Sequence, residues 1–172
     1  DILGLSQLDE GAAMPRESVS LLSLAQEAAA SLSAAAQAQN VTLTVNGTAG
    51  TLTGVRRLLS ETVRNLCENA VKYNVPGGSI TVTVAETPRA VTLTVADTGI
   101  GIPPADQSRV FERFYRVDKA RSRESGGTGL GLSIAKEIID RHEGTIELVD
   151  RSGPGLTVRI TLLVEGPHHG RE

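Results

Sequence analysis

The sequence predicts an α+β fold: a two-layer α/β sandwich in which helices cover one face of a mixed, mostly antiparallel sheet. Two patterns lead to this prediction. Several short segments alternate apolar residues with threonines, as strands do when one face is buried and the other is solvated. Longer segments place apolar residues at helical spacing, and such helices need an apolar surface to cover. A chain of 172 residues is long enough to bury a core of its own.

The first half of the chain predicts two helices and two strands. Residues 18–38 predict a short extended piece followed by an alanine-rich helix. VTLTVNG (41–47) and TLT (51–53) predict strands around a glycine-containing turn. A second helix is expected over roughly 54–73, because the NVPGG cluster at 74–78 would end it.

The second half predicts a hairpin, a long loop, a helix and two strands. Two alternating runs within 79–97, joined by a short turn, are typical of a β-hairpin. Residues 103–128 are polar and charged with little periodicity, which predicts a long loop able to act as a lid. A helix is expected over 130–142, and strands over 144–150 and 156–165. The alternation places these apolar side chains on one sheet face: Val41, Leu43, Val45, Ile80, Val82, Val84, Val91, Leu93, Val95, Val158, Ile160 and Leu162.

Composition limits the classes of function. The formal net charge of −3 argues against a general nucleic-acid binder, so any anion site must be local. A single cysteine, Cys67, excludes an intramolecular disulfide framework. No apolar run approaches the roughly 18 residues that cross a bilayer. If the parent protein is membrane-bound, the membrane segment lies outside this chain.

The helix expected within 60–74 carries a polar stripe beside its apolar one. The apolar stripe is Leu59, Val63, Leu66 and Ala70, and the polar stripe is Glu61, Asn65, Asn69 and Lys72. A solvated amphipathic face would account for this stripe. A site for Mg²⁺ shared with phosphates would also account for it, because an amide oxygen is a hard ligand and a lysine can reach phosphate.

The run VTLTVADTGIGI (91–102) directs a carboxylate to the buried face. Asp97 is in phase with the apolar residues of the run, and a buried carboxylate needs a donor or a cation. It could cap the following glycine turn through its own backbone. It could instead accept a hydrogen bond from a ligand, such as the exocyclic amine of adenine, with Gly99 and Gly101 letting the backbone pass close to that ligand.

The segment 111–136 gathers five cations before four glycines. The cations, which are either solvated beside acidic neighbours or directed at phosphate, are Arg113, Arg116, Lys119, Arg121 and Arg123. The glycines lack the lysine of a P-loop, and no dinucleotide fingerprint or eukaryotic protein-kinase motif accompanies them. We expect His142, at the end of the following helix, to cap that helix.

Four of these stretches, in this order, resemble the catalytic ATP-binding domain of bacterial sensor histidine kinases, a group that shares its nucleotide-binding fold with DNA gyrase B and heat-shock chaperone ATPases. NLCENAVKYN (65–74) resembles the N box, and DTGIGI (97–102) resembles the first G box. FERFYR (111–116) resembles the F box, and GGTGLGLSIAK (126–136) the second G box. The resemblance runs from about residue 18 to 164.

The resemblance implies a Bergerat-type ATP-binding fold with a long ATP lid. It assigns residues 1–14 to the end of the second helix of a dimerisation and phosphoacceptor domain. Residues 15–165 would be the catalytic domain and 166–172 a disordered tail. Phe111 would help to anchor the lid.

The resemblance also implies a role for each matched residue. Asn69 would bind Mg²⁺ through its amide oxygen, and Asn65 and Arg116 would be the catalytic residues. Asp97 would accept from the adenine amine, with Thr157 supporting it. The set expected around Mg-ATP is Asn65, Asn69, Lys72, Tyr73, Asp97, Gly99, Gly101, Ile102, Phe114, Arg116, Lys119, Gly127, Thr128, Gly129, Leu130, Gly131, Leu132 and Thr157.

Three functions remain open: a kinase module, an ATP hydrolase of the gyrase type, and a degenerate nucleotide-sensing module. The hydrolases carry a glutamate four residues before the Mg²⁺-binding asparagine, where this chain has Asn65. An amide is no general base at neutral pH, which favours the kinase, although Glu61 or Glu68 could assist proton transfer. All four motifs look intact, which weakens the sensing module.

The resemblance further implies partners and a location. None of His142, His168 and His169 lies in the context of the family's phosphoacceptor histidine. That histidine would belong to the chain's own dimerisation domain, and a response regulator would receive the phosphoryl group. We expect a homodimeric full-length protein anchored in the bacterial inner or cell membrane, with this part cytoplasmic, monomeric by itself and without nucleic-acid partners.

Overall fold

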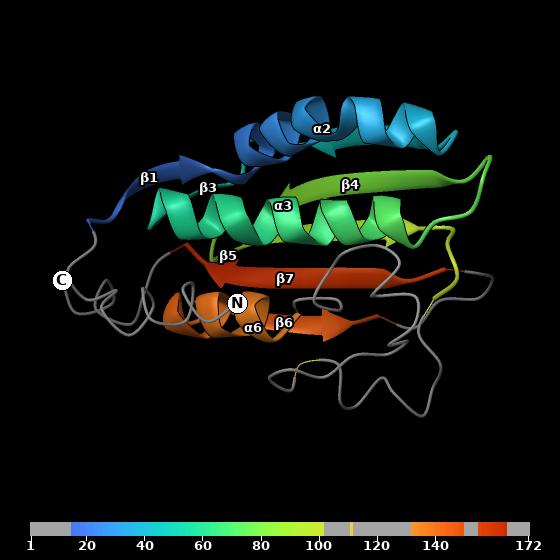
Figure 1. The fold of residues 1–172 in the computed structure, drawn as a ribbon. Helices are drawn as coiled ribbons and strands as arrows, with labels where there is room; N and C mark the ends of the chain where they lie inside the picture. Colours follow the sequence, from blue (N-terminus) through green and yellow to red (C-terminus); the bar gives the residue numbers. More distant parts are fainter. Residues whose placement is uncertain (1–14, 102–110, 112–131, 150–154, 165–172) are drawn as a thin grey trace, which may run out of the picture.

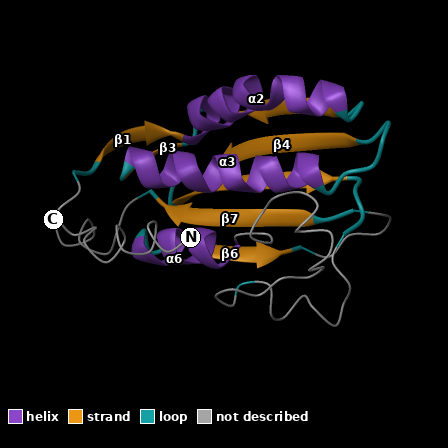
Figure 2. Ribbon diagram, viewed as in Figure 1, coloured by secondary structure: helices purple, strands orange, loops and turns teal. Residues whose placement is uncertain are grey.

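A computed structural model of the chain describes residues 15–101, 111, 132–149 and 155–164. Within these residues, three helices lie on one face of a five-stranded sheet, and a two-stranded sheet lies at one end (Figures 1 and 2). The predicted two-layer α+β sandwich is therefore confirmed. The expected lid at 103–128 falls largely outside the described residues, and both terminal segments, 1–14 and 166–172, lie outside them entirely.

The small sheet joins strand β1 (Glu17–Ser20) to strand β3 (Thr51–Gly54) in antiparallel register. Helix α2 (Leu21–Ala38) starts directly after β1, and the Ser20 hydroxyl caps it by accepting from the Ser23 N–H over 3.2 Å. The extended piece and the alanine-rich helix expected over 18–38 are both present.

The large sheet has the strand order β2-β4-β5-β7-β6. Only the β2–β4 pair is parallel, so the predicted mixed, mostly antiparallel sheet is confirmed. The hairpin expected within 79–97 is formed by β4 and β5. The five strands are β2 (Thr42–Gly47), β4 (Ser79–Glu86), β5 (Ala90–Asp97), β6 (Thr145–Leu148) and β7 (Thr157–Leu163).

Strands β2 and β3 do not pair with each other, although both lie where the sequence predicts strands. The connection between them leaves the large sheet, because Leu21 N–H donates to Gly50 O over 3.0 Å and Leu22 N–H donates to Ala49 O over 3.1 Å. These bonds tie the connection to the start of α2 and direct β3 to β1. Strand β2 instead pairs in parallel with β4, after the chain has crossed over through the next helix.

Helix α3 (Arg56–Lys72) lies beside α2, and helix α6 (Leu132–Arg141) lies beside α3 on the same face (Figure 1). Helix α3 begins two residues later than expected because Val55 is extended and forms its N-cap. None of the helices in the described ranges is long and apolar enough to cross a membrane.

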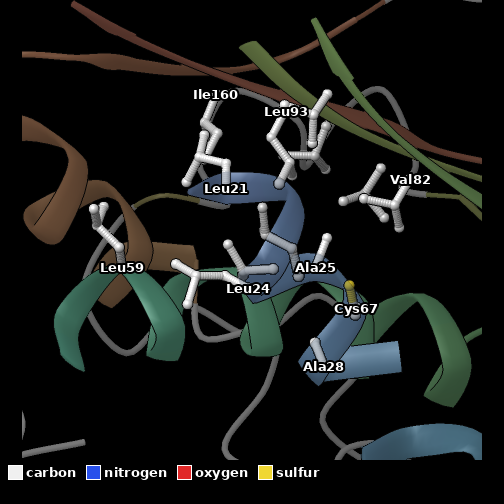
Figure 3. Close-up of a cluster of buried hydrophobic side chains, with 14 of the residues drawn as sticks. Leu21, Leu24, Ala25, Ala28, Leu59, Cys67, Val82, Leu93 and Ile160 are labelled. Carbon is white, nitrogen blue, oxygen red and sulfur yellow. The ribbon is translucent and has the colours of Figure 1, made fainter. Parts of the chain in front are cut away.

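The core lies between these helices and the sheet. Most of the predicted apolar sheet face is buried; the exceptions are Leu43 and Val45 on the edge strand β2, which are half-buried. Figure 3 shows the contact between the two layers, with side chains of α2 and α3 directed toward the sheet. Its labelled residues are Leu21, Leu24, Ala25, Ala28, Leu59, Cys67, Val82, Leu93 and Ile160.

Candidate functional site

Helix α3 presents the two stripes that the sequence predicts. The apolar stripe is fully buried: Leu59, Val63, Leu66 and Ala70. On the polar stripe, Asn65, Asn69 and Lys72 are half-buried, whereas Glu61 is exposed. The half-buried part of the stripe therefore lies toward the C-terminal end of α3, and a uniformly solvated face does not describe it.

The two asparagines of this stripe contact each other. The side-chain nitrogen Nδ2 of Asn69 donates to Oδ1 of Asn65 over 3.1 Å, one helical turn apart. Because this bond uses the nitrogen of Asn69, its amide presents the oxygen Oδ1 on the opposite side of the group. An oxygen held in this way has the chemistry that Mg²⁺ requires.

Asp97 is buried at the end of β5, as its phase predicts, with 8% of its surface exposed. Its oxygen Oδ1 accepts from Gly99 N–H over 2.8 Å and from Leu156 N–H over 3.2 Å. The expected capping of the glycine turn is thus present, and the donors satisfy a carboxylate that would otherwise be costly to bury. The same bonds fix the position of the carboxylate for any ligand.

The turn after Asp97 is attached to the C-terminal end of α3. Ile100 N–H donates to Tyr73 O over 3.0 Å. A Cβ atom on Gly99 would collide with the backbone of Tyr73 and lie 2.9 Å from the Cα of Asn74. The sequence suggested that Gly99 makes room for a ligand; in the structure, the backbone of α3's last turn occupies that space. The glycine therefore allows two chain segments to meet.

Strand β7 brings Thr157 next to Asp97. Ala96 is the register partner of Thr157, and Asp97 N–H donates to Leu156 O over 2.9 Å. Thr157 is 8% exposed. Gly155, at φ +99°, packs against the backbone of Asp97 where a side chain would collide. The resemblance assigned Asp97 and Thr157 to one adenine site, and the sheet register places the two residues at the same end of the adjacent strands β5 and β7.

A buried polar network behind this turn was not expected from the sequence. Asn74, which is 4% exposed, donates from Nδ2 to Ser79 O over 3.2 Å and accepts at Oδ1 from the Thr98 hydroxyl over 3.3 Å. Thr98 Oγ1 accepts in turn from Ser79 N–H over 2.9 Å. The network joins the end of α3, the start of β4 and the end of β5.

This network was missed because local patterns place both residues in solvent. Asn74 opens a cluster of turn residues, and Thr98 is out of phase with the buried residues of β5. The sequence feature that could have pointed to this network is Gly78. In the structure, a Cβ atom at this position would collide with the Asn74 side chain and lie 2.6 Å from Thr98 Oγ1. The glycine pair at this turn therefore indicates close packing against Asn74 and Thr98 as well as a bend in the backbone.

The structure describes only part of the expected site. It brings together the end of α3, Asp97, Gly99, Gly101 and Thr157. The following expected residues lie outside the described part of the chain: Ile102, Phe114, Arg116, Lys119, Gly127, Thr128, Gly129, Leu130 and Gly131. Leu132 is the first residue of α6, and its side chain is buried in the core. Phe111 is half-buried and packs against the core.

His142 caps the end of α6, as expected. Its Nδ1 atom lies 2.8 Å from Ile138 O, and the ring is 6% exposed. Burial is the largest cause that lowers the pKa of His142 below its ordinary value; the hydrogen bond to Ile138 raises it, and the charge of Arg16 lowers it. His142 lies at the C-terminal end of α6, and Asp97 lies at the end of β5.

Comparison with known proteins agrees with this geometry. The family described as histidine kinase-, DNA gyrase B- and HSP90-like ATPase matches residues 54–166. The chain therefore belongs to this family, and membership implies that it binds ATP. The match includes α3, β5 and β7, the elements that carry the residues described above.

Similar proteins include several sensor histidine kinases. The sensor-like histidine kinase SenX3 of Mycolicibacterium smegmatis is 36% identical over 164 residues, which covers 94% of this chain and 43% of SenX3. The sensor histidine kinase WalK of Bacillus subtilis is 46% identical over 106 residues, which covers 60% of this chain and 17% of WalK. The chain thus spans less than half the length of either relative.

Solved structures share the fold. The catalytic domain of the histidine kinase ThkA superposes with a TM-score of 0.77 at 23% identity, covering 88% of this chain and 99% of that domain. The mycobacterial sensor histidine kinase MprB superposes with a TM-score of 0.72 at 28% identity, covering 87% of this chain and 97% of that structure. The likeness to ThkA bears on the fold alone.

Proposed function

We propose that this chain is the catalytic part of a sensor histidine kinase, which binds Mg-ATP and donates the γ-phosphoryl group to a histidine on a dimerisation domain. The observation that carries the proposal is the attachment of the Asp97 turn to the end of α3 through Ile100 N–H and Tyr73 O. This bond brings a buried carboxylate suited to the adenine amine to the end of the helix that bears Asn65, Asn69 and Lys72.

Magnesium fits the residues that are present. The amide of Asn69 supplies a hard oxygen ligand, because its nitrogen is used by the bond to Asn65. Lys72, half-buried one turn further along α3, has the charge and reach for phosphate. When bound, the metal would neutralise phosphate charge. The protein residues of this half of the site would orient the nucleotide around it.

Phosphoryl transfer to a histidine suits a site of this composition. The acceptor imidazole is itself the nucleophile, so the catalytic domain needs to hold and neutralise the triphosphate and needs no strong base. Asn65 cannot remove a proton from water at neutral pH, and here its oxygen accepts from Asn69. A hydrolase of the gyrase type would instead have to use a carboxylate such as that of Glu68, half-buried on α3, as the base that activates water.

A labelling experiment separates these two activities. This chain, γ-labelled ATP and Mg²⁺ are mixed with a dimerisation domain that carries the acceptor histidine. Acid-labile, base-stable label on that domain supports the kinase, whereas free phosphate without labelled protein supports the hydrolase. Neither product, with no binding of ATP, would contradict both.

A matched pair of variants shows whether the label depends on α3. We expect Asn69→Ala to abolish Mg²⁺-dependent ATP binding and labelling without unfolding the protein. Arg64→Ala changes an exposed residue of the same helix and should leave both unchanged. Unchanged ATP affinity in Asn69→Ala would remove Asn69 from the site.

The partners follow from the same proposal. The full-length protein would be a membrane-anchored homodimer with this part on the cytoplasmic side, and this chain alone would be a monomer. A response regulator would take the phosphoryl group onto an aspartate. In support, the structural neighbours include the histidine kinase ThkA in complex with the response regulator TrrA, at a TM-score of 0.75 and 19% identity. Size-exclusion chromatography with light scattering tests the monomer.

A further inference from the structure

The ring of His142 bridges the ends of two helices that are distant in sequence. Val55 N–H, at the N-cap of α3, donates to its Nε2 over 3.0 Å. On the other side of the ring, Nδ1 lies 2.8 Å from Ile138 O in the last turn of α6. The same side chain thus satisfies a backbone donor of α3 and a backbone acceptor of α6, with only 6% of its surface exposed.

These partners determine the tautomer. A backbone N–H at Nε2 requires a lone pair there, so the proton must be on Nδ1, where it is donated to Ile138 O. Only the neutral ring satisfies both sides. A protonated ring would place a second N–H against the N–H of Val55, and this bond would be lost.

The neighbouring residues leave space for the ring and provide no substitute for it. A Cβ atom on Gly54 would lie 2.8 Å from the ring's Cδ2 and 3.0 Å from its Nε2, so the ring occupies the space of a side chain at this position. Val55 has no polar side chain, and α3 has no side-chain cap of its own at this end. The N-terminal end of α3 is therefore held by the residue that directly follows another helix.

Both bridged helices lead to the site. Helix α3 carries Asn65 and Asn69 toward its far end, and α6 starts at Leu132, within the stretch 126–136 that resembles the second G box. A change in the spacing between α3 and α6 at His142 would therefore alter how the start of α6 approaches a nucleotide bound at α3.

We propose that His142 is a positioning residue that locks α6 to α3, and that protonation of its ring opens this lock and weakens nucleotide binding. The weakening of binding rests on the function proposed above, whereas the lock itself does not. The residue acts through the two helices and has no contact with the reacting atoms.

The charge of Arg16 acts on the ring in the same direction as burial. Arg16, which precedes β1, donates from Nη2 to Arg141 O over 3.2 Å, and its charge disfavours a second positive charge nearby. On α3, Arg56 is paired with Glu17 of β1 at 3.6 Å. On α6, Arg141 lies 4.0 Å from Glu137. Asp140, also on α6, is paired with Lys136 at 3.2 Å.

The expected pH dependence follows from the lowered pKa of His142. A folded-state pKa below the unfolded value means that the lock contributes fully above about pH 6.5 and is lost as the pH falls through the folded-state pKa. The lock should therefore be closed at neutral pH and open only below the ordinary histidine pKa of about 6.5.

Two substitutions separate the lock from simple packing. His142→Gln keeps a donor and an acceptor on one amide but does not titrate. His142→Phe keeps the ring volume but leaves Val55 N–H without its acceptor. We expect the phenylalanine variant to bind a fluorescent ATP analogue with Mg²⁺ roughly fivefold to tenfold more weakly at neutral pH, as the loss of one buried hydrogen bond implies.

The test compares affinities along a pH series that starts at pH 7.5 and descends to the lowest pH at which both proteins remain folded. Titration of the nucleotide phosphates affects every variant equally, so the informative quantity is the extra loss of affinity in the wild type over His142→Gln. A severalfold extra loss supports the proposal. The same pH profile in both proteins, or wild-type affinity in His142→Phe, would overturn it and leave His142 with a packing role.

A second readout needs no nucleotide. The protection factor of the Val55 amide, which is its exchange rate relative to the intrinsic rate at the same pH, should be high in the wild type at neutral pH and should fall when the ring is protonated, whereas in His142→Gln it should not change over this pH range. Protection at Val55 that is independent of the histidine would overturn the lock. A wild type that shows the protected amide but binds no ATP would contradict the proposed function and leave the lock intact.

Discussion

The side-chain nitrogen of Asn69 donates to the side-chain oxygen of Asn65 across 3.1 Å on the half-buried stripe of α3. The bond orients one amide by means of another, so that Asn65 influences the proposed metal ligand without being a ligand itself. This relationship assigns different consequences to substitutions at the two positions.

Replacing Asn65 with alanine should weaken Mg-ATP binding by roughly tenfold, because Asn69 loses the acceptor that fixes its amide. The loss should be smaller than that in Asn69→Ala, which removes the ligand. Isothermal titration calorimetry at constant Mg²⁺ measures both. Arg64→Ala, which changes an exposed residue of α3 outside the polar stripe, is the control. Equal affinity in Asn65→Ala and the wild type would contradict the orienting role.

Gly99→Ala should destabilise the fold as well as the site. Its methyl group would collide with the backbone of Tyr73, and backbone at a helix end cannot move aside cheaply. We expect the free energy of unfolding in urea to fall by about 1–3 kcal/mol, as in overpacked cores, together with a loss of ATP affinity.

Gly77→Ala is the matched control for this prediction. A Cβ atom there meets nothing within 4 Å, although its φ of +81° strains any other residue. Its effect should be confined to a loss of about 1 kcal/mol in stability, with ATP affinity retained. If Gly99→Ala retained ATP affinity too, the attachment of the turn to α3 would not be needed for the site.

Thr98→Val should show how much the buried network contributes. The substitution keeps the shape but removes the acceptor of Ser79 N–H and the donor to Asn74. Leaving such a group unsatisfied costs about 1–3 kcal/mol, which urea unfolding would detect. Thr94→Val changes a half-buried threonine within β5, the strand that ends just before Thr98, and should have less effect. Similar losses in the two variants would argue against a specific network.

Cys67 should be unreactive in the native protein. It is fully buried on α3, and burial raises the pKa of its thiol to about 12. Mass spectrometry after iodoacetamide treatment at pH 8 should find it unmodified in buffer and modified in urea. Because the folded-state pKa is raised, its contribution to stability should be present below about pH 9 and should decline above it. Rapid native labelling would show that the core between α2 and α3 opens readily.

The sequence predicted the parts of the fold that depend on local pattern. Alternation identified the buried face of the sheet and the inward phase of Asp97, and helical spacing identified the buried stripe of α3. It did not predict that β2 would pair with β4 instead of β3, because strand partners depend on contacts far along the chain.

The residues of the candidate site could likewise be predicted from local sequence, whereas the contacts between distant segments could not. The resemblance identified residues expected at a nucleotide, but the reason for Gly99 became clear only from the backbone of Tyr73, which comes from another element. His142 was expected to cap α6, yet its bond to Val55, 87 residues away, has no signal in either local sequence.

The bond from Ile100 N–H to Tyr73 O fixes the geometry of the described part of the site. It sets the separation between the carboxylate of Asp97 and the amide of Asn69 before any nucleotide arrives. A ligand that spans these two groups need not organise them, so little ordering entropy is lost in this half. This separation corresponds to the distance from the adenine base to the metal, which is the same in ATP and ADP. We therefore expect selection for the γ-phosphate to depend on the rest of the chain.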